Sequence, residues 1–142
     1  MPAITSEATS VWTGDLKSGS GTVTLDSSQS GEVTVTWKAR SEGEKGMSNP
    51  EELLAAAHAS CFSMACANAL TKFGATPRSI QVTAAVTFDT DEGITGSHLL
   101  LSADAAGITE EDFQRVAEDA KTNCPVSRAL IGIPVTLEAE LA

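Results

Sequence analysis

The sequence contains no tyrosine, and phenylalanine and tryptophan together make up only 4% of its residues. Basic residues are also scarce, with nine Lys and Arg against nineteen Asp and Glu, so the net charge is −10. Nucleic-acid partners are therefore not expected, because phosphate backbones attract cations and unpaired bases stack on aromatic rings. The same negative charge argues against binding to anionic membrane surfaces.

A secretory leader is not expected either, since the sequence does not open with a charged segment followed by an apolar run. The longest apolar stretch, around residues 53–70, is interrupted by His58, Ser60, Ser63 and Asn68, so no membrane span is expected either. Hydrophobic residues make up 42% of the sequence and charged residues 20%. We therefore expect a cytoplasmic protein that forms a single domain over residues 1–142, long enough to bury its own core.

The three cysteines are Cys61, Cys66 and Cys124. An odd number of cysteines in a chain without an export signal is a poor basis for a disulfide framework, which leaves redox chemistry, metal binding or simple burial. No C-x-x-C or H-x-x-x-H pair accompanies them, so we expect no metal site and no cofactor.

The order of elements indicates an α+β fold, because strands and helices do not alternate regularly. Period-two patterning rich in Val and Thr predicts an antiparallel meander of three strands, and the later alternating segments are also predicted to form antiparallel pairs. The predicted strands are 10–16, 21–26, 31–39, 78–89, 94–105 and 133–141, and the predicted helices are 50–72, 110–121 and a short one from Pro125.

The helix predicted over residues 50–72 is apolar on nearly all sides. Ser48 or Asn49 can cap it, Pro50 suits its first turn, and Gly74 ends it. Such a helix needs apolar cover on both sides, which one small sheet cannot give. A homodimer that buries paired helices would supply this cover.

Four residues are candidates for chemistry. Cys61 lies on the third turn of the long helix, where a buried structural thiol is the simpler interpretation on composition alone. Cys124 precedes Pro125, and a helix N-terminus favours thiolate. Arg40, at the end of the third predicted strand, could lower the pKa of a nearby thiol.

Glu51 is the fourth candidate, although carboxylates are common in a first helical turn. Ten residues of helix place it roughly 15 Å from Cys61 along one straight helix. The two side chains can meet only if the helix bends, or if Glu51 comes from a second subunit.

Three further residues are expected to be structural. Cys66 lies about 140° around the helix from Cys61 and is expected in the core. His58 shares the Cys61 face, but no orienting group or oxyanion hole supports a Cys–His hydrolase, so packing or hydrogen bonding is expected. His98 lies in the middle of a strand and has less to indicate a role.

Two longer blocks resemble one family closely. Residues 38–65 read KARSEGEKGMSNPEELLAAAHASCFSMA, and residues 123–130 read NCPVSRAL. Together with VWTGDLKSGSGTV near the start, they resemble the OsmC/Ohr family of osmotically inducible and organic hydroperoxide resistance proteins across essentially the whole chain. The segment GEKGMSNPEEL, with an arginine just upstream, resembles the OsmC branch more than the Ohr branch.

The resemblance implies a thiol-dependent peroxidase for organic hydroperoxides, built as an intertwined homodimer with active sites at the interface. It implies that Cys61 is the peroxidatic cysteine and Cys124 the resolving one, that Arg40 activates the thiolate and that Glu51 holds this arginine. A dithiol of the dihydrolipoyl type would recycle the Cys61–Cys124 disulfide. We further expect apolar side chains such as Phe62 and Met64 to favour alkyl hydroperoxides over hydrogen peroxide.

Two alternatives keep the same fold. A redox sensor or binding module would form the Cys61–Cys124 disulfide without fast turnover, so dithiol-dependent turnover separates it from an enzyme. A structural stress protein would have unreactive thiols in its native state.

Overall fold

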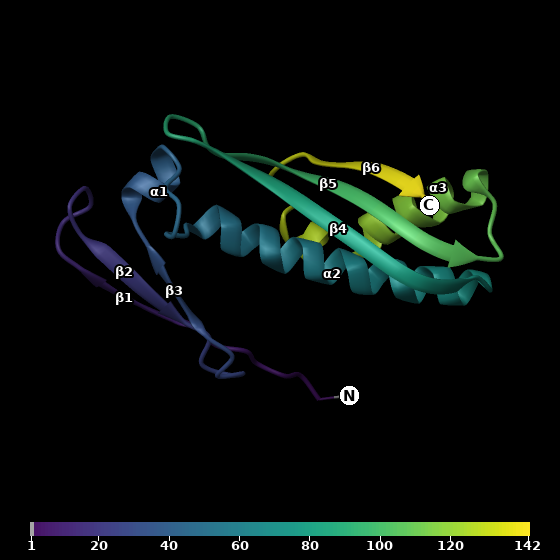
Figure 1. Cartoon of the computed structure of the whole chain (residues 1–142), viewed down its shortest axis with the longest axis horizontal. Helices are drawn as coiled ribbons and strands as arrows, with labels where there is room; N and C mark the ends of the chain where they lie inside the picture. Colours follow the sequence, from purple (N-terminus) through teal and green to yellow (C-terminus); the bar gives the residue numbers. More distant parts are fainter. Residues whose placement is uncertain (1) are drawn as a thin grey trace. The chain divides into compact units, whose positions relative to one another are not determined.

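The computed structural model describes residues 2–142 (Figure 1). The chain divides into two compact units, one up to Leu53 and the other Leu54–Ala142, and each is described by itself. The elements are β1 (Thr9–Thr13), β2 (Ser20–Thr24), β3 (Glu32–Val35), α1 (Trp37–Ser41), α2 (Pro50–Phe73), β4 (Thr76–Asp89), β5 (Gly93–Ala106), α3 (Glu110–Asn123), α4 (Pro125–Ala129) and β6 (Val135–Leu141).

The first unit contains the predicted antiparallel meander, in the order β1-β2-β3. In its register Val11 lies opposite Thr22, and Val23 lies opposite Val33. Apolar side chains of this sheet stay partly exposed in the single chain, since Val11 is 64% exposed and Trp12 is 40% exposed. The meander therefore offers an apolar surface that one chain leaves uncovered.

The third strand is shorter than predicted, because the chain turns into helix α1 at Trp37. The Thr36 side chain accepts a hydrogen bond from the Ala39 N–H at 3.0 Å and so caps this helix. The prediction that the strand continues to residue 39 is therefore wrong. Arg40 lies on a short helix rather than at the end of a strand.

Helix α2 begins and ends as its sequence predicts. Asn49, not Ser48, supplies the side-chain cap, because its Oδ1 accepts a hydrogen bond from the Glu52 N–H at 2.8 Å. Gly74 ends the helix with a φ of +104°, a backbone conformation that costs glycine little, and the Ala75 N–H then donates to the Leu70 carbonyl.

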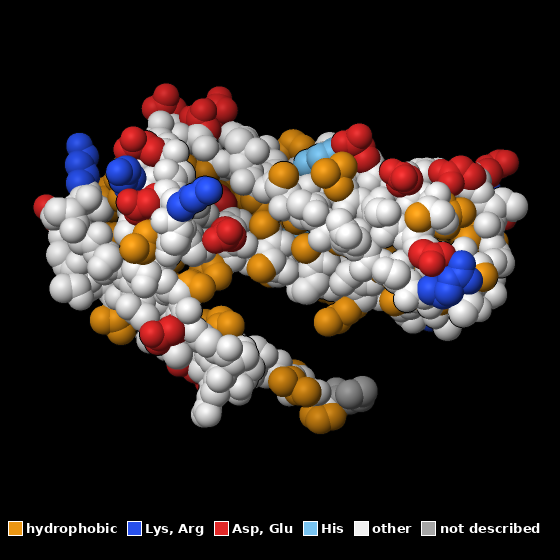
Figure 2. Space-filling model, viewed as in Figure 1, with side chains coloured by type: hydrophobic (Ala, Val, Ile, Leu, Met, Phe, Trp, Pro, Cys, Tyr) orange, Lys and Arg blue, Asp and Glu red, His pale blue; other side chains and the backbone are white. Residues whose placement is uncertain are grey.

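By length and composition alone, α2 could cross a membrane, with a mean hydropathy of 1.4 over its most apolar window. Core helices of soluble proteins have the same character. Only 22% of that window is buried inside the single chain, so most of this apolar helix needs cover from elsewhere. Apolar side chains also reach the surface at many places on the face seen in Figure 2.

The second unit is built on a sheet in the order β4-β5-β6. Strands β4 and β5 pair antiparallel as predicted, but β6 pairs with β5 in parallel, so the prediction of purely antiparallel sheets is wrong for this strand. Two helices, α3 and α4, lie between β5 and β6 in the chain. A connection of this length can return the chain to the same end of the sheet, which parallel pairing requires.

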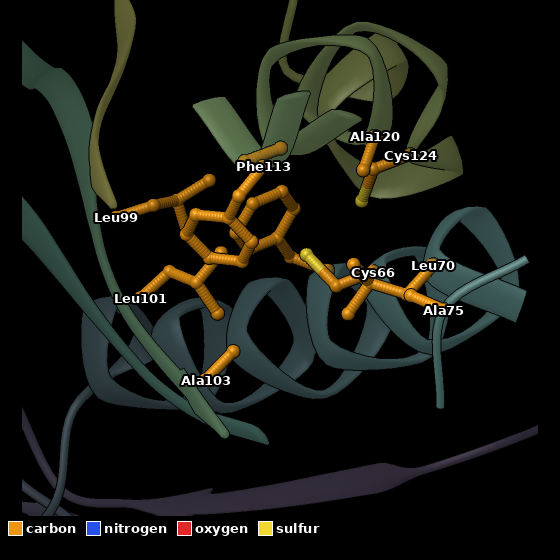
Figure 3. Packing of buried hydrophobic residues seen from close by; sticks show 11 residues of the cluster. Cys66, Leu70, Ala75, Leu99, Leu101, Ala103, Phe113, Ala120 and Cys124 are labelled. Carbon is orange, nitrogen blue, oxygen red and sulfur yellow. The ribbon is translucent and has the colours of Figure 1, made fainter. Parts of the chain in front are cut away.

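The core of this unit lies between one face of the sheet and helices α2 and α3 (Figure 3). Leu99, Leu101 and Ala103 alternate along β5 and point toward the helices, as period-two spacing requires. Phe62 and Leu70 of α2 and Phe113 of α3 complete the centre of the cluster. Burial of each Leu or Phe side chain in this cluster contributes about 1.5–3 kcal/mol to the stability of the fold.

Candidate active site

The thiols of Cys61 and Cys124 lie next to each other. Their Sγ atoms are 3.2 Å apart, and both cysteines are free. Cys61 comes from the middle of α2, where it is partly exposed, whereas Cys124 is fully buried. A peroxide from solvent therefore has access to Cys61 and not to Cys124.

Cys124 lies between two helices, α3 and α4. It follows the last residue of α3, and it is the N-cap of α4, as its position before Pro125 predicts. Its backbone N–H donates to the Ala120 carbonyl of α3, and its side chain makes no capping hydrogen bond to α4. The buried thiol thus lies at the junction of α3 and α4.

The surroundings of the two thiols shift their pKa values in opposite directions. Burial by itself would raise the pKa of Cys124, but the hydrogen bonds from Ser127, Cys61 and Val126 together lower it. Burial raises the pKa of Cys61, and the neighbouring Cys124 raises it further. Within a single chain the first negative charge of the pair is therefore favoured on Cys124.

Arg40 and Glu51 form an ion pair within the first unit. The Arg40 Nε lies 3.1 and 3.2 Å from the two carboxylate oxygens of Glu51, and Nη2 lies 2.9 Å from Oε2. The Glu51 side chain is 6% exposed and that of Arg40 is 31% exposed. The carboxylate thus fixes the plane of the guanidinium and leaves part of it accessible.

Beside Cys61 lies a groove of about 510 Å³, between α2 and the end of α3. Met64 lines the groove as expected, but Phe62 does not, because its side chain is fully buried in the core. Residues 61 and 62 point in directions about 100° apart on a helix, so they cannot both face the groove. The lining residues are Cys61, Met64, Ala65, Asn68, Ala69, Lys72, Asp119, Ala120, Asn123 and Pro125.

His58 is buried and hydrogen-bonded, as predicted. Its Nδ1 lies 2.7 Å from the Ser97 hydroxyl oxygen and its Nε2 lies 2.8 Å from the Ser127 hydroxyl oxygen. Sequence reasoning missed both serines. Neither has an unusual spacing, and only the position of Ser127 two residues after Pro125 could have drawn attention to it.

The remaining thiol and imidazole lie away from the cysteine pair. Cys66 is buried in the core, and burial raises its pKa to about 12. His98 lies near Thr136 and Glu138 on neighbouring strand β6. Among residues 2–142 no group of three or more His, Cys, Asp or Glu side chains is placed to hold a metal ion.

The family model described as OsmC-like protein matches residues 41–138. The chain belongs to the OsmC family. The match includes Glu51, Cys61 and Cys124, and Arg40 lies one residue before it. Membership thus agrees with the two sequence blocks that first indicated it.

Individual relatives agree with this membership. Peroxiredoxin OsmC of Escherichia coli (strain K12) is 42% identical over 133 residues, which cover 92% of both proteins. Organic hydroperoxide resistance protein-like 1 of Staphylococcus saprophyticus is 32% identical over 104 residues, 71% of this chain and 73% of that protein. The higher identity to the first favours the OsmC branch over the Ohr branch.

The fold of this OsmC family member is also that of solved structures. An organic hydroperoxide resistance protein from Elizabethkingia anophelis, with crystallant-derived thiocyanate bound, superposes with a TM-score of 0.69. The alignment covers 99% of both chains at 28% identity.

Proposed function

We propose that this OsmC family member is a cysteine-based peroxidase that reduces organic hydroperoxides, and hydrogen peroxide more weakly, in the cytoplasm. The observation that carries the proposal is the 3.2 Å separation between the accessible Cys61 thiol and the buried Cys124 thiol. The names of two relatives, a peroxiredoxin and an organic hydroperoxide resistance protein-like protein, support the reaction class.

In the first step the Cys61 thiolate attacks the distal oxygen of the hydroperoxide. The O–O bond breaks, the alkoxide leaves and takes a proton to become the alcohol, and Cys61 becomes a sulfenic acid. Partial exposure of Cys61 and the apolar part of the adjoining groove, including Met64, suit a substrate with an alkyl group. Hydrogen peroxide has no alkyl group to bury there.

In the second step Cys124 attacks the sulfenic sulfur. An S–S bond forms, the S–O bond breaks, and the oxygen leaves as water after protonation. A small dithiol, of the dihydrolipoyl type, then reduces the disulfide through two thiol–disulfide exchanges and becomes a cyclic disulfide itself. Both thiols are then restored for the next turnover.

The first step requires negative charge on Cys61, whereas the hydrogen bonds of a single chain favour it on Cys124. A nearby guanidinium would reverse this preference by stabilising the Cys61 thiolate. We assign this role to Arg40, held by Glu51.

Helical rise places Glu51 roughly 15 Å from the Cys61 of its own helix if that helix is straight. We therefore assign each active site to two subunits of a homodimer, with Arg40 and Glu51 from one and both cysteines from the other. The uncovered apolar surface of α2 and of the meander supports such a dimer. Each chain contributes as one OsmC-like domain, residues 1–142.

The test measures consumption of cumene hydroperoxide and of hydrogen peroxide with dihydrolipoamide as the donor. We expect faster loss of the organic peroxide, no turnover in Cys61→Ser, and unchanged turnover in the matched control Cys66→Ser. In Cys124→Ser, one equivalent of peroxide should leave a sulfenic acid on Cys61 that dimedone traps.

Two results would contradict the proposal. A reversible Cys61–Cys124 disulfide without dithiol-dependent turnover would indicate a redox sensor. Native thiols that peroxide does not oxidise would indicate a structural protein.

A further inference from the structure

One side chain joins the short helix that carries Arg40 to the helix that carries Glu51. Asn49 lies just before α2, and the two ends of its amide bond in different directions. Its Oδ1 accepts a hydrogen bond from the Glu52 N–H at 2.8 Å, whereas its Nδ2 donates to the Ala39 carbonyl at 2.9 Å. A single amide therefore caps α2 and also joins α1 to it.

Helix α1 gains a partner for its C-terminal end through this contact. It has only five residues, Trp37–Ser41, and so short a helix is marginal on its own in water. The last four carbonyls of a helix have no partner within it, and the carbonyl of Ala39 is among them. Ala39 is 2% exposed, so water does not readily replace the amide of Asn49 as donor.

The N-terminal end of α1 is ordered separately. The Thr36 hydroxyl oxygen accepts from the Ala39 N–H and donates to Glu44 Oε1, each at 3.0 Å. These bonds stay within residues 36–44, so they order α1 without joining it to α2. The contact from Asn49 does both.

Arg40 is consequently held from two directions by the first turn of α2. Glu51 binds its guanidinium, and Asn49 binds the carbonyl of the residue before it. An arginine side chain has many rotamers, so an ion pair alone leaves its backbone free to move. With the backbone fixed, less freedom is lost when the guanidinium binds the carboxylate, and the two contacts support each other.

We propose that Asn49 is a positioning residue for Arg40, which fixes α1 on the first turn of α2 so that the guanidinium stays on Glu51 in one orientation. This inference rests on the proposed function, in which Arg40 of one subunit stabilises the Cys61 thiolate of the other. Asn49 touches no reacting atom in this role. A misplacement of about 1 Å in a charged group can lower a rate about a hundredfold, so a contact remote from the thiol can control it.

Substitution separates the two ends of the amide. Asn49→Ser keeps an oxygen that caps α2 about as well as asparagine does, but its side chain is one bond shorter and has no NH₂ group to donate to Ala39. Asn49→Thr has the same properties and replaces it if Asn49→Ser fails to fold. The matched control is Thr109→Ala, which removes a cap from α3, where the Thr109 hydroxyl oxygen accepts from the Asp112 N–H.

The first measurement follows the Arg40 side chain itself. The arginines of the chain are Arg40, Arg78, Arg115 and Arg128, so ¹⁵N spectra resolve their Nε–H groups, and Arg40→Lys identifies the signal of interest. We expect the Arg40 Nε–H to exchange with water about tenfold faster in Asn49→Ser than in wild type, because it leaves Glu51 more often. Thr109→Ala should keep the wild-type rate. A wild-type rate in Asn49→Ser as well would overturn the proposal.

The second measurement follows Cys61 in a Cys124→Ser background, by iodoacetamide alkylation from pH 5 to 10. Burial raises the pKa of Cys66 to about 12, so this other thiol stays protonated. We expect Asn49→Ser to shift the alkylation midpoint upward, because the Cys61 thiolate loses a well-placed cation. An unshifted midpoint would overturn the proposal even if Arg40 exchanges faster.

Stability and turnover complete the comparison. With both cysteines present, Asn49→Ser should lower kcat/KM for cumene hydroperoxide about tenfold but keep the wild-type midpoint of urea unfolding, because the cap of α2 is retained. Thr109→Ala should show the reverse pattern, with a lower unfolding midpoint and unchanged kcat/KM. If the two variants share one pattern, Asn49 acts only on stability and the proposal is wrong.

Failure of the inference can be told apart from failure of the proposed function. If wild type consumes peroxide but Asn49→Ser keeps the wild-type exchange rate and alkylation profile, the peroxidase stands and the inference is wrong. If wild type consumes no peroxide, the proposed function is wrong, while the Nε–H exchange still measures whether Asn49 orders Arg40.

Discussion

The Sγ atoms of Cys61 and Cys124 lie 3.2 Å apart, although the two cysteines are 63 positions apart in the sequence. A disulfide has an S–S distance of about 2.05 Å, so forming one requires the sulfur atoms to approach by roughly 1 Å. The fold thus holds the two thiols within a short movement of disulfide distance.

Oxidation should therefore stabilise the protein. Closing a loop of this length lowers the entropy of the unfolded chain and is worth about 4 kcal/mol. We expect the protein oxidised with one equivalent of cumene hydroperoxide to unfold at higher guanidinium concentration than the reduced protein. Cys124→Ser should show no such difference, and equal midpoints for both forms of the wild type would mean that the disulfide strains the fold.

Phe62 and Met64 lie two residues apart on α2 but should respond differently to substitution. Phe62 is fully buried, so Phe62→Ala should cost about 3–5 kcal/mol of stability. Met64 is 71% exposed in the single chain and lines the groove, so Met64→Ala should leave stability within about 0.5 kcal/mol and raise the KM for cumene hydroperoxide. Chemical denaturation and steady-state kinetics measure the two effects. An unchanged KM in Met64→Ala would remove this side chain from the substrate site.

Cys66 should make the protein less stable at alkaline pH. Burial raises its pKa from 9.0 to about 12, so the folded state holds the thiol proton more tightly than the unfolded state does. The stability from this difference is fully present below pH 9 and is lost as the pH rises toward 12.

Between pH 9 and 10.5 the loss should be about 2 kcal/mol. Urea unfolding of wild type and Cys66→Ala over this range isolates the effect, because all other titrating groups are common to both proteins. The substitution also removes packed atoms, but that offset is constant with pH. Parallel pH profiles for the two proteins would contradict the prediction.

Activity should be restored when two inactive variants form mixed dimers. If Arg40 and Glu51 serve the Cys61 of the partner subunit, a dimer of one Glu51→Gln chain and one Cys61→Ser chain contains one doubly defective site and one intact site. Refolding an equal mixture should recover about a quarter of wild-type turnover, since half of the dimers are mixed and half of their sites are intact.

The control is a mixture of Cys61→Ser with Cys124→Ser. Both of these residues belong to the same chain of each site, so no mixed dimer has an intact one, and dithiol-dependent turnover should stay absent. Glu51→Gln alone should reduce kcat/KM about 10–100-fold, because the guanidinium loses a charged partner. No recovery in the first mixture would place all four residues within one chain.

The strand and helix patterns in the sequence predicted most of the elements, for local reasons. Helix α2 is bounded by Asn49 and Gly74, which act on neighbouring backbone groups, and the cap at Thr109 is equally local. The C-terminal end of β3 and the direction of β6 were predicted wrongly. At Thr36 a side-chain cap overrides a strand pattern, and alternation along β6 is the same whether it pairs parallel or antiparallel.

The residues of the candidate site could be predicted where they lie in a sequence block that resembles the family. Contacts that form only when distant segments pack together could not be predicted. Cys61, Glu51 and Cys124 lie inside such blocks, and the bond between Arg40 and Glu51 agrees with the expectation from the resemblance. Ser97 meets His58 only because β5 packs against α2, and no sequence spacing encodes a contact across 39 residues.

The parallel pairing of β6 gives the last strand of the chain an unexpected importance. Because α3 and α4 form the crossover between β5 and β6, the segment that carries Cys124 is joined at both ends to strands of the same sheet. The strand at the C-terminal end of this segment is β6, the seven-residue edge strand Val135–Leu141. Proteolytic trimming of this strand would free one end of the crossover and impair thiol pairing without removing any residue of the site.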